Sequence, residues 1–114
     1  MEFGKTSEEV VTLDYLPEFE RAPLLNIRVQ PDWDYVEEWA VVLVLREYSL
    51  EGKEAETDEI ARIDNSHGQE PHIHRLFEEE NSEEYLNLNT WEEAKDYLDN
   101  NKEQFIRKYI ENRD

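Results

Sequence analysis

The chain has 114 residues, of which 30 are acidic and 12 basic, so its formal net charge is −18. It has no cysteine, which excludes a disulfide framework, a cysteine-ligated zinc site, an iron–sulfur cluster and a thiol nucleophile. Hydrophobic residues make up 38% of the sequence and aromatic residues 11%, which is enough for one modest core. We therefore expect a single domain over residues 1–114.

The hydropathy of the sequence gives no sign of a membrane partner. No apolar run approaches the roughly 18 residues that a membrane-spanning helix needs. The first residues, Met-Glu-Phe-Gly-Lys, also lack the long apolar segment of a secretion signal. We expect a cytoplasmic protein.

The surplus of acidic residues disfavours RNA as a partner at low salt. Phosphate polymers carry charge of the same sign, so long-range electrostatics repel them. Three explanations of the charge stay open: adaptation to the salt-rich cytoplasm of a halophile, where screening is strong, mimicry of a nucleic acid, or a binding surface for a basic protein partner. The first explanation would remove the objection to an RNA substrate.

Residues 1–23 are expected to be partly irregular, with one short edge strand at 9–13, and residues 24–77 are expected to form a sheet. The first strand of this sheet is predicted over 24–30, where apolar and polar residues alternate, and Pro31 ends it. The residues that share its apolar face are Leu25, Ile27 and Val29.

Three further strands follow along the chain. Residues 40–45 are the most apolar stretch and are rich in branched side chains, which is typical of a strand buried on both faces. A glycine turn at 49–54 leads to a strand over 57–65, and residues 72–77 return antiparallel to it. Together with the first strand, they predict an antiparallel meander of about four strands.

Residues 78–89 are expected to be an acidic linker and residues 90–112 a helix. Thr90 and Glu93 have the spacing of a capping box, in which the two side chains satisfy free amides of the first turn. An apolar stripe would pack this helix on the sheet, and its members are Trp91, Ala94, Leu98, Phe105 and Tyr109. The pair Asn100–Asn101 interrupts the stripe and indicates a kink. The fold class is α+β.

All three histidines of the chain, His67, His72 and His74, fall within eight residues. Strand side chains alternate between faces, so His72 and His74 share one face, as do Arg62 and Asp64 on the preceding strand. The expected cross-strand pairs are Arg62 with His74, Ile63 with Ile73, and Asp64 with His72. Burial of the isoleucine pair selects this register, which gathers the four polar side chains on one exposed surface.

These four residues carry the parts of a metal-independent ribonuclease or a phosphoryl transferase. An imidazole can take or give a proton near neutral pH, a carboxylate can orient its ring, and a guanidinium can hold a phosphate or a developing oxyanion. On this hypothesis Arg62 binds phosphate, His72 or His74 acts as acid and base, and Asp64 sets the tautomer of an imidazole. No cofactor is expected.

Two other interpretations of the cluster stay open. His67, His72, His74 and Asp64 could supply three nitrogens and one oxygen to zinc or a similar ion, although their spacing matches no strong metal motif. The cluster could also be a surface histidine pair beside a cross-strand ion network, which contributes at most about 1 kcal/mol to stability.

The run Arg-Ile-Asp-Asn at 62–65, followed by Pro-His-Ile-His at 71–74, resembles the signature of the TumE family of toxin–antitoxin proteins. The resemblance covers about residues 59–77. It implies the toxin-like half of a pair, with a helix-turn-helix antitoxin as partner. The functional face that it implies consists of Arg62, Asp64, Asn65, His72 and His74. The chain departs from the family pattern in its extreme acidity and in a longer charged stretch before the last helix.

The leading hypothesis is a toxin-like protein that acts on RNA or nucleotides through the Arg/Asp/His cluster, with a cognate antitoxin as its partner. The alternative is a non-enzymatic acidic interaction module, in one form a nucleic-acid mimic, that binds a basic protein surface. The exposed edges of a short meander also favour a homodimer.

Overall fold

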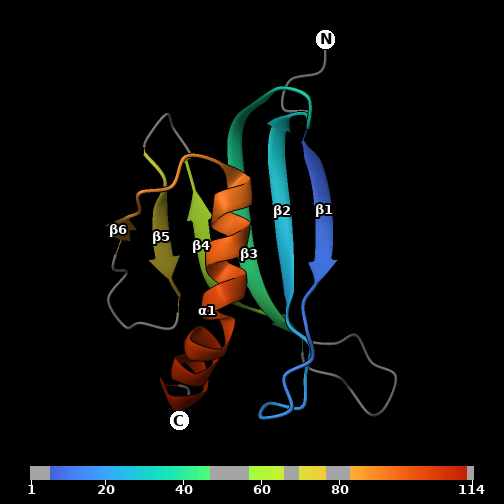
Figure 1. Cartoon of the computed structure of the whole chain (residues 1–114), viewed down its shortest axis with the longest axis vertical. Helices are drawn as coiled ribbons and strands as arrows, with labels where there is room; N and C mark the ends of the chain where they lie inside the picture. The colour runs from blue at the N-terminus through green and yellow to red at the C-terminus, as the bar shows by residue number, and fades with distance from the viewer. Residues whose placement is uncertain (1–5, 47–56, 66–69, 77–82, 113–114) are drawn as a thin grey trace.

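The computed structural model describes residues 6–46, 57–65, 70–76 and 83–112. In these ranges the chain forms one sheet of six strands and one helix (Figure 1). The strands pair in chain order, each antiparallel to the next. The elements are β1 (Ser7–Thr12), β2 (Leu24–Pro31), β3 (Val36–Arg46), β4 (Thr57–Asp64), β5 (His72–Arg75), β6 (Glu83–Tyr85) and α1 (Trp91–Asn112).

The predicted α+β meander with one C-terminal helix is confirmed, but the predicted count of about four strands was too low. The short edge strand expected at 9–13 is present as β1, two residues earlier at its start, and it pairs along its whole length with β2. β6 lies inside the segment 78–89 that was expected to be a linker, and it extends the sheet beyond β5. The glycine turn expected at 49–54 lies outside the described residues.

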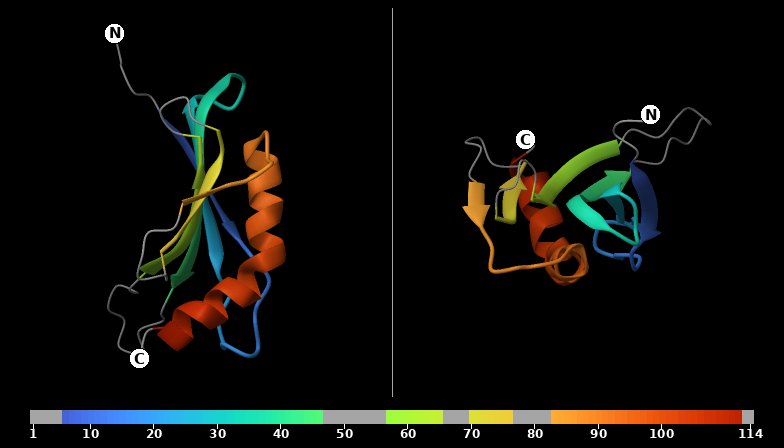
Figure 2. Two further views of the ribbon diagram at one scale, coloured as in Figure 1. Left: turned by 90° about the vertical axis from the view of Figure 1, so that its left-hand side faces the viewer. Right: turned by 90° about the horizontal axis from the view of Figure 1, so that it is seen from above.

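The helix covers one face of the sheet (Figure 2), and the main core lies between them. Alternating side chains of the central strands point to this face, as the sequence pattern predicts. The helix contributes Ala94, Leu98, Phe105 and Ile106. The sheet contributes Leu25, Ile27 and Val29 from β2, Trp39, Val41, Leu43 and Leu45 from β3, Ile60, Ala61 and Ile63 from β4, and Ile73 from β5.

The side chains that alternate with these core residues along each strand lie on the other face of the sheet, which we call the second face. Here Leu24, Val42 and Val44 form a small separate apolar cluster. The same face bears Arg62 and Asp64, because Arg62 pairs with Val42 in the ladder between β3 and β4. The polar cluster therefore lies on the side of the sheet away from α1.

Helix α1 begins with the predicted capping box. Thr90 Oγ1 accepts a hydrogen bond from Glu93 N at 3.2 Å, and Glu93 Oε1 accepts one from Asn89 N at 3.4 Å. The two halves of the helix run in different directions (Figure 2). The amide of Asn101 donates to the Tyr97 carbonyl at 2.8 Å, and such side-chain bonds to the preceding turn bend helices. The described helix is not long and apolar enough to cross a membrane.

Candidate functional site

The structure brings the four predicted site residues together on the second face, in the predicted register. Arg62 lies opposite His74, Asp64 opposite His72, and Ile63 opposite Ile73. The isoleucines are fully buried on the helix side. A slip of one residue would expose both of them and bury the charged side chains, so the apolar pair holds the cluster in place.

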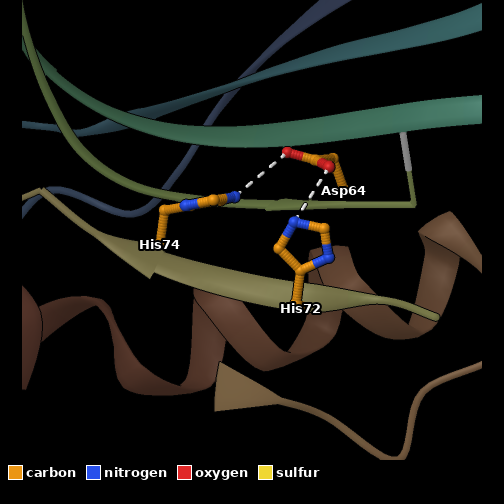
Figure 3. Close-up of side chains that lie close together, drawn as sticks. All are labelled: Asp64, His72 and His74. Carbon is orange, nitrogen blue, oxygen red and sulfur yellow. Dashed lines mark ion pairs between the residues drawn. The ribbon is translucent and has the colours of Figure 1, made fainter. Parts of the chain in front are cut away.

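Asp64 is the centre of the cluster (Figure 3). Its Oδ1 lies 3.5 Å from His72 Nε2, and its Oδ2 lies 3.8 Å from His74 Nε2. Arg62 Nε lies 3.0 Å from the same Oδ2. The two imidazole rings are in edge-to-face contact, with centroids 4.7 Å apart. One carboxylate thus faces three nitrogen-bearing side chains.

The cluster is more buried than the exposed surface that the sequence predicted. Asp64 is only 4% exposed and His72 5%, whereas the side chain of Arg62 is 41% exposed. Strand β6 contributes to the burial of His72, because Tyr85 lies opposite it with the centroids of the two rings 5.9 Å apart. The strand β5 is therefore an inner strand, and a ligand would meet Arg62 before it reached Asp64.

The tautomer of His72 follows from its surroundings. Its Nδ1 lies 3.0 Å from the backbone carbonyl oxygen of Glu70. A carbonyl oxygen can only accept, so Nδ1 must donate the hydrogen of this bond. In the neutral ring, Nε2 then carries the lone pair, and this nitrogen is the one that faces Asp64.

Two other residues named from the sequence do not join the described cluster. The Asn65 side chain is used by the neighbouring strand: its Oδ1 accepts from Trp39 N at 2.8 Å, and its Nδ2 donates to the Glu37 carbonyl at 3.3 Å. This geometry gives Asn65 a structural role in holding β3 against the end of β4. His67 lies outside the described residues.

A hollow of about 160 Å³ lies on the sheet, lined by Arg28, Gln30, Glu38, Trp39 and Ala40. It adjoins the cluster, because Ala40 is the cross-strand partner of Asp64. None of these residues belongs to the site that the sequence predicts. Arg28 could have been identified from the alternation of side chains along β2, which places it on the second face. The contact of His72 with the backbone carbonyl of Glu70 could not, because any residue type has such a carbonyl.

The fold and the cluster define a class: a small α+β domain, in which a six-stranded meander packs on a C-terminal helix and presents an Asp/His/His/Arg site on the opposite face. The chain belongs to the family described as "Domain of unknown function (DUF7718)", whose match covers residues 5–114. No significant match exists among curated proteins or among solved structures. The resemblance to the TumE family stays a prediction.

Proposed function

We propose that the protein acts on RNA or a nucleotide at the Asp64 cluster, as the toxin-like component of a TumE-type pair. One observation carries the proposal. A single carboxylate faces a guanidinium at 3.0 Å and imidazole nitrogens at 3.5 and 3.8 Å. These are the groups that bind a phosphate and move a proton in phosphodiester chemistry.

The exposures of the side chains divide the roles. Arg62, with 41% of its side chain exposed, would hold a substrate phosphate at the rim of the cluster. The imidazole–carboxylate group behind it would transfer the proton, with Asp64 fixing the orientation of the rings. Arg28, which lines the adjoining hollow and is ion-paired with Glu8 at 3.3 Å, would exchange this partner for the phosphate of a longer substrate.

The test measures cleavage of RNA and hydrolysis of nucleotides by the purified protein at high salt, where the repulsion of phosphate by the acidic surface is screened. Arg62→Gln should lower the rate about 10- to 100-fold, because a charge-assisted hydrogen bond contributes about 1.5–3 kcal/mol. Arg107→Gln is the matched control, since Arg107 is similarly exposed, also ion-paired, and located on the helix. Its activity should equal that of the wild type.

A double variant provides the decisive case in cells. His72→Ala combined with His74→Ala should abolish any growth effect of the expressed protein while the circular dichroism spectrum stays that of a folded domain. If this folded double variant keeps the full cellular effect, the proposal is wrong.

The net charge of −18 favours a second candidate, an acidic module that binds a basic protein. This function does not need the cluster. Replacing exposed glutamates by glutamine should then weaken partner capture in proportion to the charge removed, whereas Arg62→Gln should have no effect. Capture that is indifferent to the glutamate changes would exclude this candidate.

A further inference from the structure

The contact between His72 and Asp64 sets two hydrogen-bond acceptors against each other. The Nδ1 of His72 donates to the Glu70 carbonyl, so the neutral ring offers a lone pair at Nε2. This lone pair faces Asp64 Oδ1, a second acceptor, at 3.5 Å. A cation between these two acceptors, either an added proton or a metal ion, would remove the repulsion between them.

The distances favour the metal ion. A proton shared between an imidazolium and a carboxylate draws the nitrogen and oxygen to about 2.7–2.9 Å, yet the two imidazole nitrogens lie 3.5 and 3.8 Å from Asp64. Ligand atoms that surround a tetrahedral ion at about 2.0–2.1 Å lie roughly 3.4 Å from one another. The three ligand atoms of Asp64, His72 and His74 lie within 4.8 Å of one another.

We infer that Asp64, His72 and His74 bind a divalent transition-metal ion of the zinc type, through one carboxylate oxygen and two imidazole nitrogens. Two imidazoles and a carboxylate are the protein ligands of many catalytic zinc sites, which keep a further position for water or substrate. The hydrogen bond from His72 to a backbone carbonyl is the support that metal-binding imidazoles commonly have.

Arg62 would complete the site from outside. Its Nε lies 3.0 Å from Asp64 Oδ2, the oxygen that also faces His74. The other oxygen, Oδ1, faces His72 and would be the carboxylate oxygen that binds the ion. The net charge of the chain, −18, would favour binding of the ion, because its long-range field attracts cations.

The metal site is inferred from geometry and does not require the proposed function. If both hold, His72 and His74 would be metal ligands instead of the acid and base, a metal-bound water would be the group that loses a proton at neutral pH, and Arg62 would hold the phosphate beside it. Zinc binding is measured without RNA, so the two proposals can fail separately. Activity that survives in chelator-stripped protein would overturn the catalytic use of the metal, and zinc binding without any RNA cleavage would leave only the metal site.

The first experiment titrates Zn²⁺ into chelator-stripped protein against a chromophoric competitor. We expect one tight site, weakened in Asp64→Asn and in His74→Gln by at least the 10- to 100-fold that changes around metal ligands cause. Asp99→Asn is the matched control, because Asp99 is a helix carboxylate paired with Lys102. Equal affinity in all four proteins would show that zinc binds only to the acidic surface and would overturn the inference.

The second experiment needs no variant in the site, so it is valid even if a substituted cluster fails to fold. Because the chain has three histidines, their ring nitrogens give a simple ¹⁵N spectrum, and His67→Ala identifies the signal of His67. One equivalent of Zn²⁺ should shift an Nε2 resonance of His72 and of His74 together. Rings of His72 and His74 that do not respond to zinc would overturn the inference.

Discussion

The position of Asp64 is set by apolar residues that take no part in the proposed reaction. The fully buried Ile63 and Ile73 fix the register of β4 on β5, and this register sends Asp64 and His72 to the second face. Tyr85 then covers His72 from β6. Packing on the helix side of the sheet, where no site residue lies, thus determines which side chains meet on the second face.

Asn65 follows Asp64 at the end of β4, and its variant tests whether its role is structural. Asn65→Ala removes the hydrogen bonds to Trp39 N and to the Glu37 carbonyl, and leaves a backbone amide without its partner. We expect the free energy of unfolding in urea to fall by about 1–2 kcal/mol, with zinc affinity unchanged. Asn100→Ala, at an exposed helix position, should cause no such loss, and equal stability of wild type and Asn65→Ala would refute the structural role.

The ion pair between Glu18 and Arg107 links the connection between β1 and β2 to the helix. Arg107 Nη2 lies 2.8 Å from Glu18 Oε2, and the hydrogen bonds from Arg107 lower the pKa of Glu18 below its usual value. A carboxyl with a lowered pKa in the folded state stabilises the fold above its unfolded pKa, and this contribution is lost as the pH falls through the folded pKa.

Glu18→Gln should therefore destabilise the protein slightly at neutral pH and not at all in acid below the folded pKa of Glu18. The effect is small because both side chains are about half exposed and screened by solvent. Urea unfolding of wild type, Glu18→Gln and Arg107→Gln across the acid range tests this expectation. A difference between wild type and Glu18→Gln that persists at the lowest pH would contradict it.

The capping box accounts for where α1 begins. Thr90→Ala removes the acceptor of the Glu93 amide hydrogen bond and should lower the free energy of unfolding by about 0.5–2 kcal/mol. Thr90→Ser keeps the hydroxyl and is the matched control, with stability close to that of the wild type. If both variants lose the same stability, the lost methyl group of Thr90, and not the cap, is responsible.

The elements with strong local signals could be predicted from the sequence. The alternation in β2 and the apolar run in β3 follow from which faces are buried, and the bend of α1 follows from Asn101, whose side chain bonds the preceding turn. Tertiary packing did not have to override any of these signals. The pairing of Arg62, Asp64, His72 and His74 was predictable for the same reason, because Ile63 and Ile73 admit one register.

Strand β6 could not be predicted, and the burial of the site depends on it. The residues of β6, Glu83 to Tyr85, have no apolar alternation. β6 is held by backbone pairing with β5 and by the contact of Arg75 Nη2 with Glu84 Oε2 at 2.7 Å. With β5 as the last strand, His72 would lie at the edge of the sheet, which is why the sequence predicted an exposed cluster. Backbone hydrogen bonds depend little on the side chains, so the sequence gives little indication of them.

The whole molecule confines a net charge of −18 within a radius of gyration of 14.9 Å. At most 12 of the 30 acidic residues can be matched one to one by a lysine or arginine. Mutual repulsion of the uncompensated carboxylates opposes the compact state, and its range is the screening length. That length falls from about 10 Å at 0.1 M salt to about 3 Å at 1 M.

We therefore expect the midpoint of thermal unfolding to rise steeply with NaCl between about 0.1 and 1 M, the interval in which the screening length falls about threefold. Replacing the exposed Glu9, Glu37 and Asp96 by their amides should raise the midpoint at low salt and flatten its dependence on NaCl. Sucrose, which stabilises without screening charge, separates the two effects: it should raise the midpoints of wild type and variant equally. A midpoint of the wild type that does not change with NaCl would show that the fold already tolerates its charge, and the acidic surface would then be explained by a basic partner instead of by salt.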